Sequence, residues 1–155
     1  MLGPPVDAWH VWLGLSLAGV VLVGVGATLP TAPPPAAASA ADTVDRLAAT
    51  ERSATAEHPL DATAIRIGAS RIGLRNDAGT THAAFAFGPV TPATGSQALR
   101  AVLRGAPPES RFETGDALCE ASAEARAQTP RWRPAEGPLI VRHVVWEECD
   151  VTLVG

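Results

Sequence analysis

The chain has 155 residues and a formal net charge of -4, and all 12 of its basic residues are arginine. A weakly acidic chain lacks the concentrated positive field that nucleic-acid phosphates require, so DNA and RNA are not expected partners. Without its first 35 residues the chain retains about 120, which is enough for one ordinary domain and too few for two.

An uncharged segment at residues 8–29, AWHVWLGLSLAGVVLVGVGATL, follows a short N-terminal tail at 1–7. At ~1.5 Å per residue, a helix of this length crosses the ~30 Å apolar layer of a membrane. We therefore expect a transmembrane helix over 8–29. A cleaved secretory signal is the alternative, because 38–40 form an A-x-A site. Such signals have a basic start and a shorter apolar run, which favours a retained anchor.

The predicted membrane helix has a stripe that includes three small residues. Residues that recur at intervals of four and three form it: Trp12, Ser16, Gly19, Val23 and Gly26. Small residues let membrane helices approach closely, so we expect the helix to associate with itself or with another membrane protein. The alternative is that glycine is simply common in membrane helices.

No basic residue precedes the helix to set its orientation in the membrane. The stalk-like sequence after the helix favours a domain on the external side.

The sequence PTAPPPAAASAA at residues 30–41 has neither a charge nor a large side chain. It is predicted to be a Pro/Ala-rich linker in a partly stiff polyproline conformation. We assign 42–155 to a single α+β domain. In that domain a short helix is expected from Asp42, and extended structure from near Ser53.

Alternating apolar and polar residues predict an antiparallel meander of three strands over 64–87, with turns at 68–70 and 76–79. A run at 139–147 is apolar on both faces, which is typical of a central strand, and 151–154 should be the last strand. Two helices are expected between these strands, one from Ser96 to Gly105 and one from about Thr114 to Gln128.

The predicted fold class is therefore α+β, with an N-terminal transmembrane helix, a proline-rich stalk, and a small mostly antiparallel sheet with two packed helices.

Cys119 and Cys149 are the only cysteines, and neither a CxxC motif nor a suitable histidine spacing indicates a zinc site. In an oxidising compartment the two can form a disulfide, and two buried free thiols are the alternative.

Carboxylates at Glu147, Glu148 and Asp150 surround one turn. Their spacing matches no established calcium loop, so we expect a solvated acidic turn and no metal or cofactor.

Arg66, Arg71 and Arg75 should share the outward face of the first hairpin, as the only clustered positive patch in the chain. Such a patch can bind lipid phosphates or an acidic partner. The alternative is the ordinary solvated side of a strand.

Three histidines, His58, His82 and His143, are candidate general bases, but none has a nucleophile or a second ligand at a diagnostic spacing. No GxSxG, HExxH or phosphate-binding loop is present. We therefore predict no catalytic residue. A membrane-tethered hydrolase that uses one of these histidines is the alternative.

Five strings identify a family: PVDAWHVWLG at 5–14, LPTAPPP at 29–35, ATAEHPLDA at 54–62, LRNDAGTTHAAFAFGPVTP at 74–92, and the ending WEECDVTLVG. On these strings the chain resembles haloarchaeal membrane-anchored proteins with a domain of unknown function. The resemblance assigns no chemistry to any residue, and it implies an association with archaeal pilus or secretion machinery.

The layout of one N-terminal apolar helix and a β-rich domain also resembles that of type IV pilins. However, no basic residue precedes a processing site, as pilin leaders need. We therefore expect an uncharacterised single-pass cell-membrane protein, in contact with membrane lipid. Its expected role is that of a non-enzymatic structural or interaction component of an envelope, pilus-like or secretion assembly.

Overall fold

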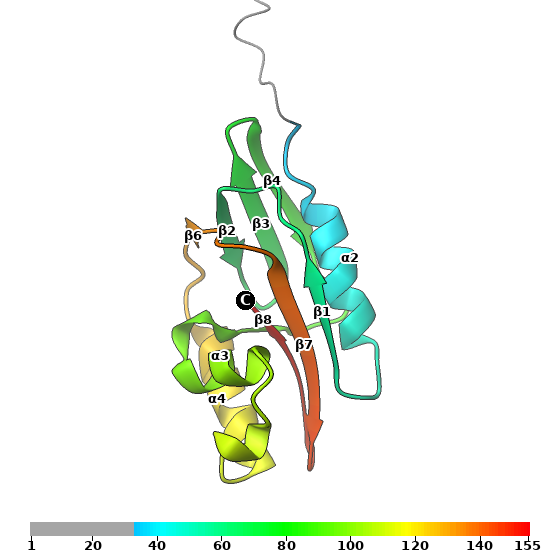
Figure 1. The fold of residues 1–155 in the computed structure, drawn as a ribbon, viewed down its shortest axis with the longest axis vertical. Helices are drawn as coiled ribbons and strands as arrows, with labels where there is room; N and C mark the ends of the chain where they lie inside the picture. Colours follow the sequence, from blue (N-terminus) through cyan, green and yellow to red (C-terminus); the bar gives the residue numbers. More distant parts are fainter. Residues whose placement is uncertain (1–32) are drawn as a thin grey trace, which may run out of the picture. The chain divides into compact units, whose positions relative to one another are not determined.

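The computed structural model describes residues 33–155, of which Pro34–Gly155 form one compact unit (Figure 1). The predicted tail at 1–7 and the predicted membrane helix at 8–29, with its stripe of small residues, lie outside the described residues. Within 33–155, no helix has the length and apolar character that a membrane crossing needs.

The described residues contain two four-stranded sheets. The first sheet has the order β1-β7-β8-β5, and its only parallel pair is β5 with β8. Its strands are β1 (Ala54–His58), β7 (Leu139–Trp146), β8 (Cys149–Val154) and β5 (Thr91–Pro92). The second sheet has the order β4-β3-β2-β6 and is entirely antiparallel. Its strands are β4 (Gly79–Ala84), β3 (Arg71–Asn76), β2 (Ala64–Ile67) and β6 (Arg133–Pro134).

Three α-helices complete the described part: α2 (Ala37–Ala48), α3 (Gln97–Leu103) and α4 (Gly115–Ala127). Short 3-10 turns, η1 (Ala93–Gly95) and η2 (Pro108–Ser110), precede α3 and α4. The α+β class is confirmed, and the three helices include the two expected at 96–105 and 114–128, but the expected single sheet is wrong because the described residues form two sheets. Periodicity identifies strands without identifying their partners, and β7 pairs with β1 and β8 instead of joining the meander.

Helix α2 begins at Ala37, inside the segment 30–41 that was expected to be a spacer. Its buried apolar side chains pack against both sheets, and they are Ala37, Ala40, Ala41 and Val44. Alanine is the strongest helix former, and its small side chain lets a helix lie close to a sheet. The spacer prediction therefore does not hold for 37–41, and the folded unit begins before Asp42.

Strand β7 lies between β1 and β8, as its apolar character on both faces predicted. On one face, Leu139 and Val141 join a core with α2 and the inner side of the second sheet. On the other face, Val144 joins a second core with α3 and α4. The cores thus meet at β7.

The meander β2-β3-β4 forms as the alternating pattern predicted, with Ile65 opposite Leu74 and Leu74 opposite Thr81, although β4 ends at Ala84 and does not reach 87. Ile72 and Leu74 are fully buried on the side of α2. The other side of these strands therefore carries their polar residues.

Candidate functional site

A cation–aromatic surface, made of Arg66, Arg75, His82 and Trp132, lies on the polar side of the second sheet. The guanidinium groups of Arg66 and Arg75 lie 5.0 and 4.8 Å from the centre of the Trp132 ring. Nη2 of Arg66 lies 3.1 Å from Nε2 of His82, whose ring meets Trp132 edge-on. These contacts draw two of the three arginines of the predicted patch together around one indole ring.

Strand register explains how this surface forms. Arg66 is opposite Gly73, which is in turn opposite His82, so the three lie in one row across β2, β3 and β4. A Cβ atom on Gly73 would lie only 3.1 Å from the indole of Trp132 and 2.9 Å from His82. Glycine at the centre of the row therefore makes room for the two rings. Arg71 is exposed on the same side of β3, and it has no contact with Trp132 in the structure.

Within 33–155, no carboxylate forms an ion pair with this surface. The one ion pair within 4.0 Å among residues 33–155 is His143 with Asp150, so none of the arginines there pairs with an acidic side chain. Each cation–π contact is worth about 0.5–1 kcal/mol at an exposed site, which orients the guanidinium groups without neutralising their charge. Their charge therefore remains available to an acidic group from outside.

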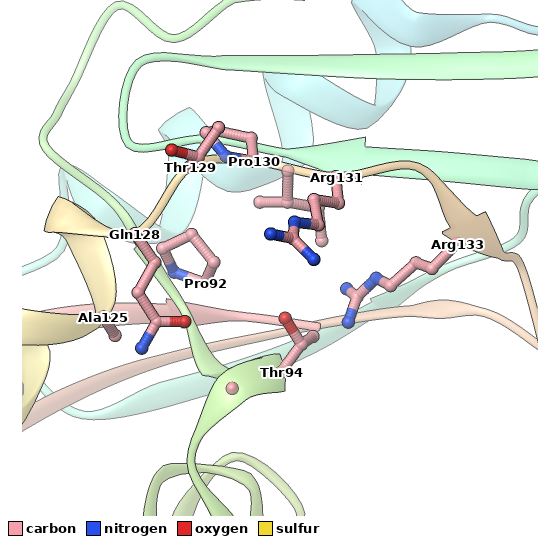
Figure 2. Close-up of a pocket in the computed structure, with 10 residues that line it drawn as sticks. Pro92, Thr94, Ala125, Gln128, Thr129, Pro130, Arg131 and Arg133 are labelled. Atoms are coloured by element: carbon pink, nitrogen blue, oxygen red, sulfur yellow. The ribbon is translucent and has the colours of Figure 1, made fainter.

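A second arginine-rich feature, the arginine pocket, is a cavity of about 480 Å³ beside β6 (Figure 2). Arg131 and Arg133 both direct their guanidinium groups into it, and the hydroxyl of Thr94 faces them (Figure 2). Because side chains alternate along an extended segment, Arg131 and Arg133 face the pocket while Trp132 faces the opposite side. Gln128 contributes an amide that lies close over Gly95, where a Cβ atom would approach Oε1 to 2.6 Å.

A neighbouring cavity of about 310 Å³ shares Thr94 and Arg133 with the arginine pocket. It adds Arg100 and Arg104 from α3 and the segment after it, together with Glu136. Burial lowers the pKa of Arg133, and the positive charge of Arg100 lowers it further. The Arg133 cation is thus disfavoured by its surroundings, and an anion placed beside it would relieve that cost.

The three candidate histidines do not form a common site. His82 belongs to the second sheet, while His58 and His143 belong to the first. His58 is opposite Leu139 and His143 is opposite Ala54, which separates the two by roughly 13 Å along the strands.

Each histidine instead has its own local partners. His58 contacts the hydroxyls of Ser39 and Thr43 on α2, at 3.1 Å each. His143 is buried, with Nδ1 at 3.1 Å from Oγ1 of Thr152. Its Nε2 lies 3.3 Å from Asp150 Oδ1, in an orientation that makes no hydrogen bond.

The acidic turn after β7 has a structural contact. Oε2 of Glu147 accepts a hydrogen bond of 2.6 Å from the backbone N–H of Gly115, at the first residue of α4. A carboxylate at this position stabilises the N-terminus of a helix. Glu148 and Asp150 are exposed. Among residues 33–155, no group of three acidic, histidine or cysteine side chains is placed to hold a metal ion.

Cys119 and Cys149 are joined by a disulfide, with their Cα atoms 5.8 Å apart. The bond links α4 to the first residue of β8. It lies in the core formed with α3 and α4, and neither cysteine lines the arginine pocket.

Two parts of these sites were not predicted from the sequence. Trp132 directly precedes the two-residue strand β6, in a segment without a visible period, and the arginine pocket is built from turns and from segments that border helices. The alternation Arg131-Trp132-Arg133 next to Pro134 was the available signal, since it predicts an edge strand with different residues on its two sides.

Comparison with known proteins gives a family. Residues 3–144 match the profile of a family described as "Family of unknown function (DUF7283)". The chain belongs to this family. The match includes Arg66, Arg75, Trp132 and the residues of the arginine pocket. No curated protein and no solved structure matches the chain. The family confirms a domain of unknown function and assigns no role to any residue.

Proposed function

We propose that this protein is a non-enzymatic interaction component of an envelope, pilus-like or secretion assembly in a haloarchaeal cell. In this proposal residues 8–29 hold it in the membrane as a single-pass anchor, and the folded unit lies on the external side. The uncharged length of 8–29 and the resemblance of the chain to membrane-anchored proteins support the anchor.

The cation–aromatic surface carries the proposed interaction role. It occupies the side of the second sheet opposite α2 and the core. Tryptophan and arginine are enriched at the energetic centres of protein interfaces, because both combine a large flat surface with polar donors. Arg66 and Arg75 have no carboxylate partner within 33–155. An acidic segment of another protein in the assembly is the partner that this charge favours.

Crosslinking in native membranes tests the interaction. A C-terminally tagged form should recover a partner protein or a second copy of the chain. The variant Arg75→Glu should reduce that recovery severalfold, because it places a like charge against an acidic partner. Arg111→Glu is the matched control, since Arg111 is exposed and lies outside both arginine-rich sites. Recovery of no protein, or equal recovery from the Arg75 variant, would contradict the proposal.

Intact mass spectrometry of the same sample tests the anchor. We expect the mass of a chain that retains residues 8–29, recovered with the membrane after an alkaline carbonate wash. A mass that corresponds to residues 41–155 would show cleavage after the A-x-A site and would remove the anchor from the proposal.

One contact favours a second candidate function, a membrane-tethered hydrolase. The Thr43 hydroxyl donates to the carbonyl oxygen of Ser39, so Nδ1–H of His58 is the donor toward Thr43 Oγ1. Nε2 of His58 is then free to accept the proton of the Ser39 hydroxyl at 3.1 Å. A serine nucleophile and its base need this arrangement. Neither residue lines the arginine pocket or the cavity next to it, which makes this candidate the weaker one.

A fluorophosphonate probe, which labels activated serines, distinguishes the two functions. Under the interaction proposal the wild type is labelled no faster than Ser39→Ala. Rapid labelling that Ser39→Ala and His58→Ala abolish, and that the control Ser70→Ala retains, would favour the hydrolase. Ser70 is a suitable control because it is an exposed serine in a turn of the meander.

A further inference from the structure

The donors of the arginine pocket converge on one space. Arg131 and Arg133 enter it from the segment at β6, Thr94 from η1 on the opposite wall, and Gln128 from the end of α4 (Figure 2). Guanidinium groups present several N–H donors in one plane and bind oxyanions in a bidentate manner. A hydroxyl and a side-chain amide add further donors. The cavity is therefore lined by hydrogen-bond donors from three separate elements.

These donors have no partner within the described chain. The side chains of Arg131 and Arg133 make neither an ion pair nor a hydrogen bond to any residue of 33–155. Glu136 is the one acidic residue that lines either cavity, and it belongs to the neighbouring one. Arg133 is half-buried, and burial and the charge of Arg100 both lower its pKa. A partly desolvated cation without a counter-ion is unfavourable, and a bound anion reduces that cost.

The size of the space indicates the class of ligand. Its volume of about 480 Å³ lies within the range of small-molecule sites, which is roughly 300–1,000 Å³. The neighbouring cavity continues past Arg133 and Thr94 to Arg100 and Arg104. A ligand that fills both cavities would thus meet positive charge at two places. A phosphate group suits the first place, because its oxygens can accept hydrogen bonds from both guanidinium groups and from Thr94 at once.

We propose that the arginine pocket binds the phosphate group of a small phosphorylated molecule, whose remaining negative charge extends past Arg133 toward Arg100. This site is separate from the cation–aromatic surface, because Arg131 and Arg133 point away from the side on which Trp132 lies. The inference does not depend on the proposed interaction role.

Titration calorimetry on the full-length chain in a neutral detergent tests the proposal, with inorganic phosphate and pyrophosphate as probes. We expect both to bind, and pyrophosphate to bind more tightly because it reaches toward Arg100. Arg133→Gln should weaken both by roughly tenfold or more, since it removes a charged hydrogen-bond donor. Arg131→Gln should have a similar effect at a more exposed position, so a folding defect of the Arg133 variant cannot explain both results.

Two variants sharpen the test. Arg100→Gln should remove the advantage of pyrophosphate over phosphate and leave phosphate binding within twofold of wild type. Arg111→Gln, outside both cavities, should bind both probes as the wild type does. The absence of binding by wild type, or equal losses in the Arg111 and Arg133 variants, would overturn the site. Equal binding of the two probes, unaffected by Arg100→Gln, would overturn the extension toward Arg100.

Discussion

Strand β7 has a hydrophobic core on each face, and different helices cover the two. On one side, the 12-residue α2 packs its alanines and Val44 between the two sheets. On the other side, the seven-residue α3 and the 13-residue α4 share the cover.

The second side has additional fixed contacts that join its helices to the β7–β8 hairpin. The Cys119–Cys149 disulfide holds α4, and Glu147 accepts a hydrogen bond at the N-terminus of that helix. Nη1 of Arg142 donates to the carbonyl oxygens of Val102 and Ala106 at the C-terminal end of α3. Helix α3 has only seven residues and buries little surface by itself, so the charged contact from Arg142 complements its apolar packing. We therefore expect the stability of the two sides to depend on different contacts.

The largest effects should come from removing a core side chain on either side. Ile72→Ala in the α2 core and Leu118→Ala in the α4 core should each lower the free energy of unfolding by about 2–5 kcal/mol. Both side chains are fully buried. Because β7 belongs to both cores, chemical denaturation followed by circular dichroism should show one transition for each variant. Two separated transitions would show that the cores unfold independently.

The disulfide should matter mainly to the α4 side. Replacing both Cys119 and Cys149 by serine should cost about 3 kcal/mol, as expected for a cross-link that closes a loop of 30 residues. Hydrogen exchange should become faster at α4 amides than at α2 amides. An equal increase in both helices would contradict the division of the molecule into differently held sides.

A carboxylate on the α2 side should have an intermediate effect. Asp45 accepts hydrogen bonds from the backbone N–H groups of Ala86 and Phe87, at 3.0 Å, and so holds the segment after β4 to α2. Asp45→Asn should cost about 2 kcal/mol in thermal or chemical denaturation, because hydrogen bonds to a charged acceptor are the stronger kind. Asp42→Asn, an exposed position in the same helix, should change stability by less than about 0.5 kcal/mol. Equal losses of stability in the two variants would show that the net charge of α2, and not this hydrogen bond, determines the effect.

The smallest effect should come from the carboxylate on the α4 side. Glu147→Gln should cost about 1 kcal/mol, because it removes a charge from the N-terminus of α4 while keeping the side-chain size. Glu148→Gln is the control, since that side chain is exposed and makes no hydrogen bond within 33–155. If Glu148→Gln lowers the free energy of unfolding as much as Glu147→Gln does in the same denaturation experiment, the effect comes from the net charge of the turn and not from the contact with α4.

Sequence reasoning succeeded where one pattern repeats over several residues. The alternation around Arg66 and Ile72 predicted β2 and β3, and caps at Ser96 and Thr114 marked the starts of α3 and α4, where both hydroxyls accept a backbone N–H. It failed for the pairing of strands, because apolar residues on both faces of β7 are equally compatible with several neighbours. It predicted the later part of α2 from Asp42 but missed its start at 37–41, because proline precedes an alanine run there and packing on two sheets decided the conformation.

The candidate site was predicted only in part. Arg66, Arg71 and Arg75 do share one face, since their period along β2 and β3 is local information. Trp132 reaches them because β6 pairs with β2, a contact between residues far apart in the sequence. The arginine pocket depends wholly on such contacts: Thr94, Gln128 and Arg133 belong to three elements that meet only in the folded unit.

The short strand β6 limits which insertions the two arginine-rich sites can tolerate. It is only two residues long, and its register with β2 places Arg133 opposite Ile65. Inserting one residue just before Arg133 would turn Trp132 toward the cavity and Arg131 outward, because neighbouring side chains point in opposite directions. Such an insertion would damage both sites at once, whereas an insertion of two residues would preserve their sides. Both sites are therefore more sensitive to the number of residues around Arg131, Trp132 and Arg133 than to the identity of the other residues in this segment.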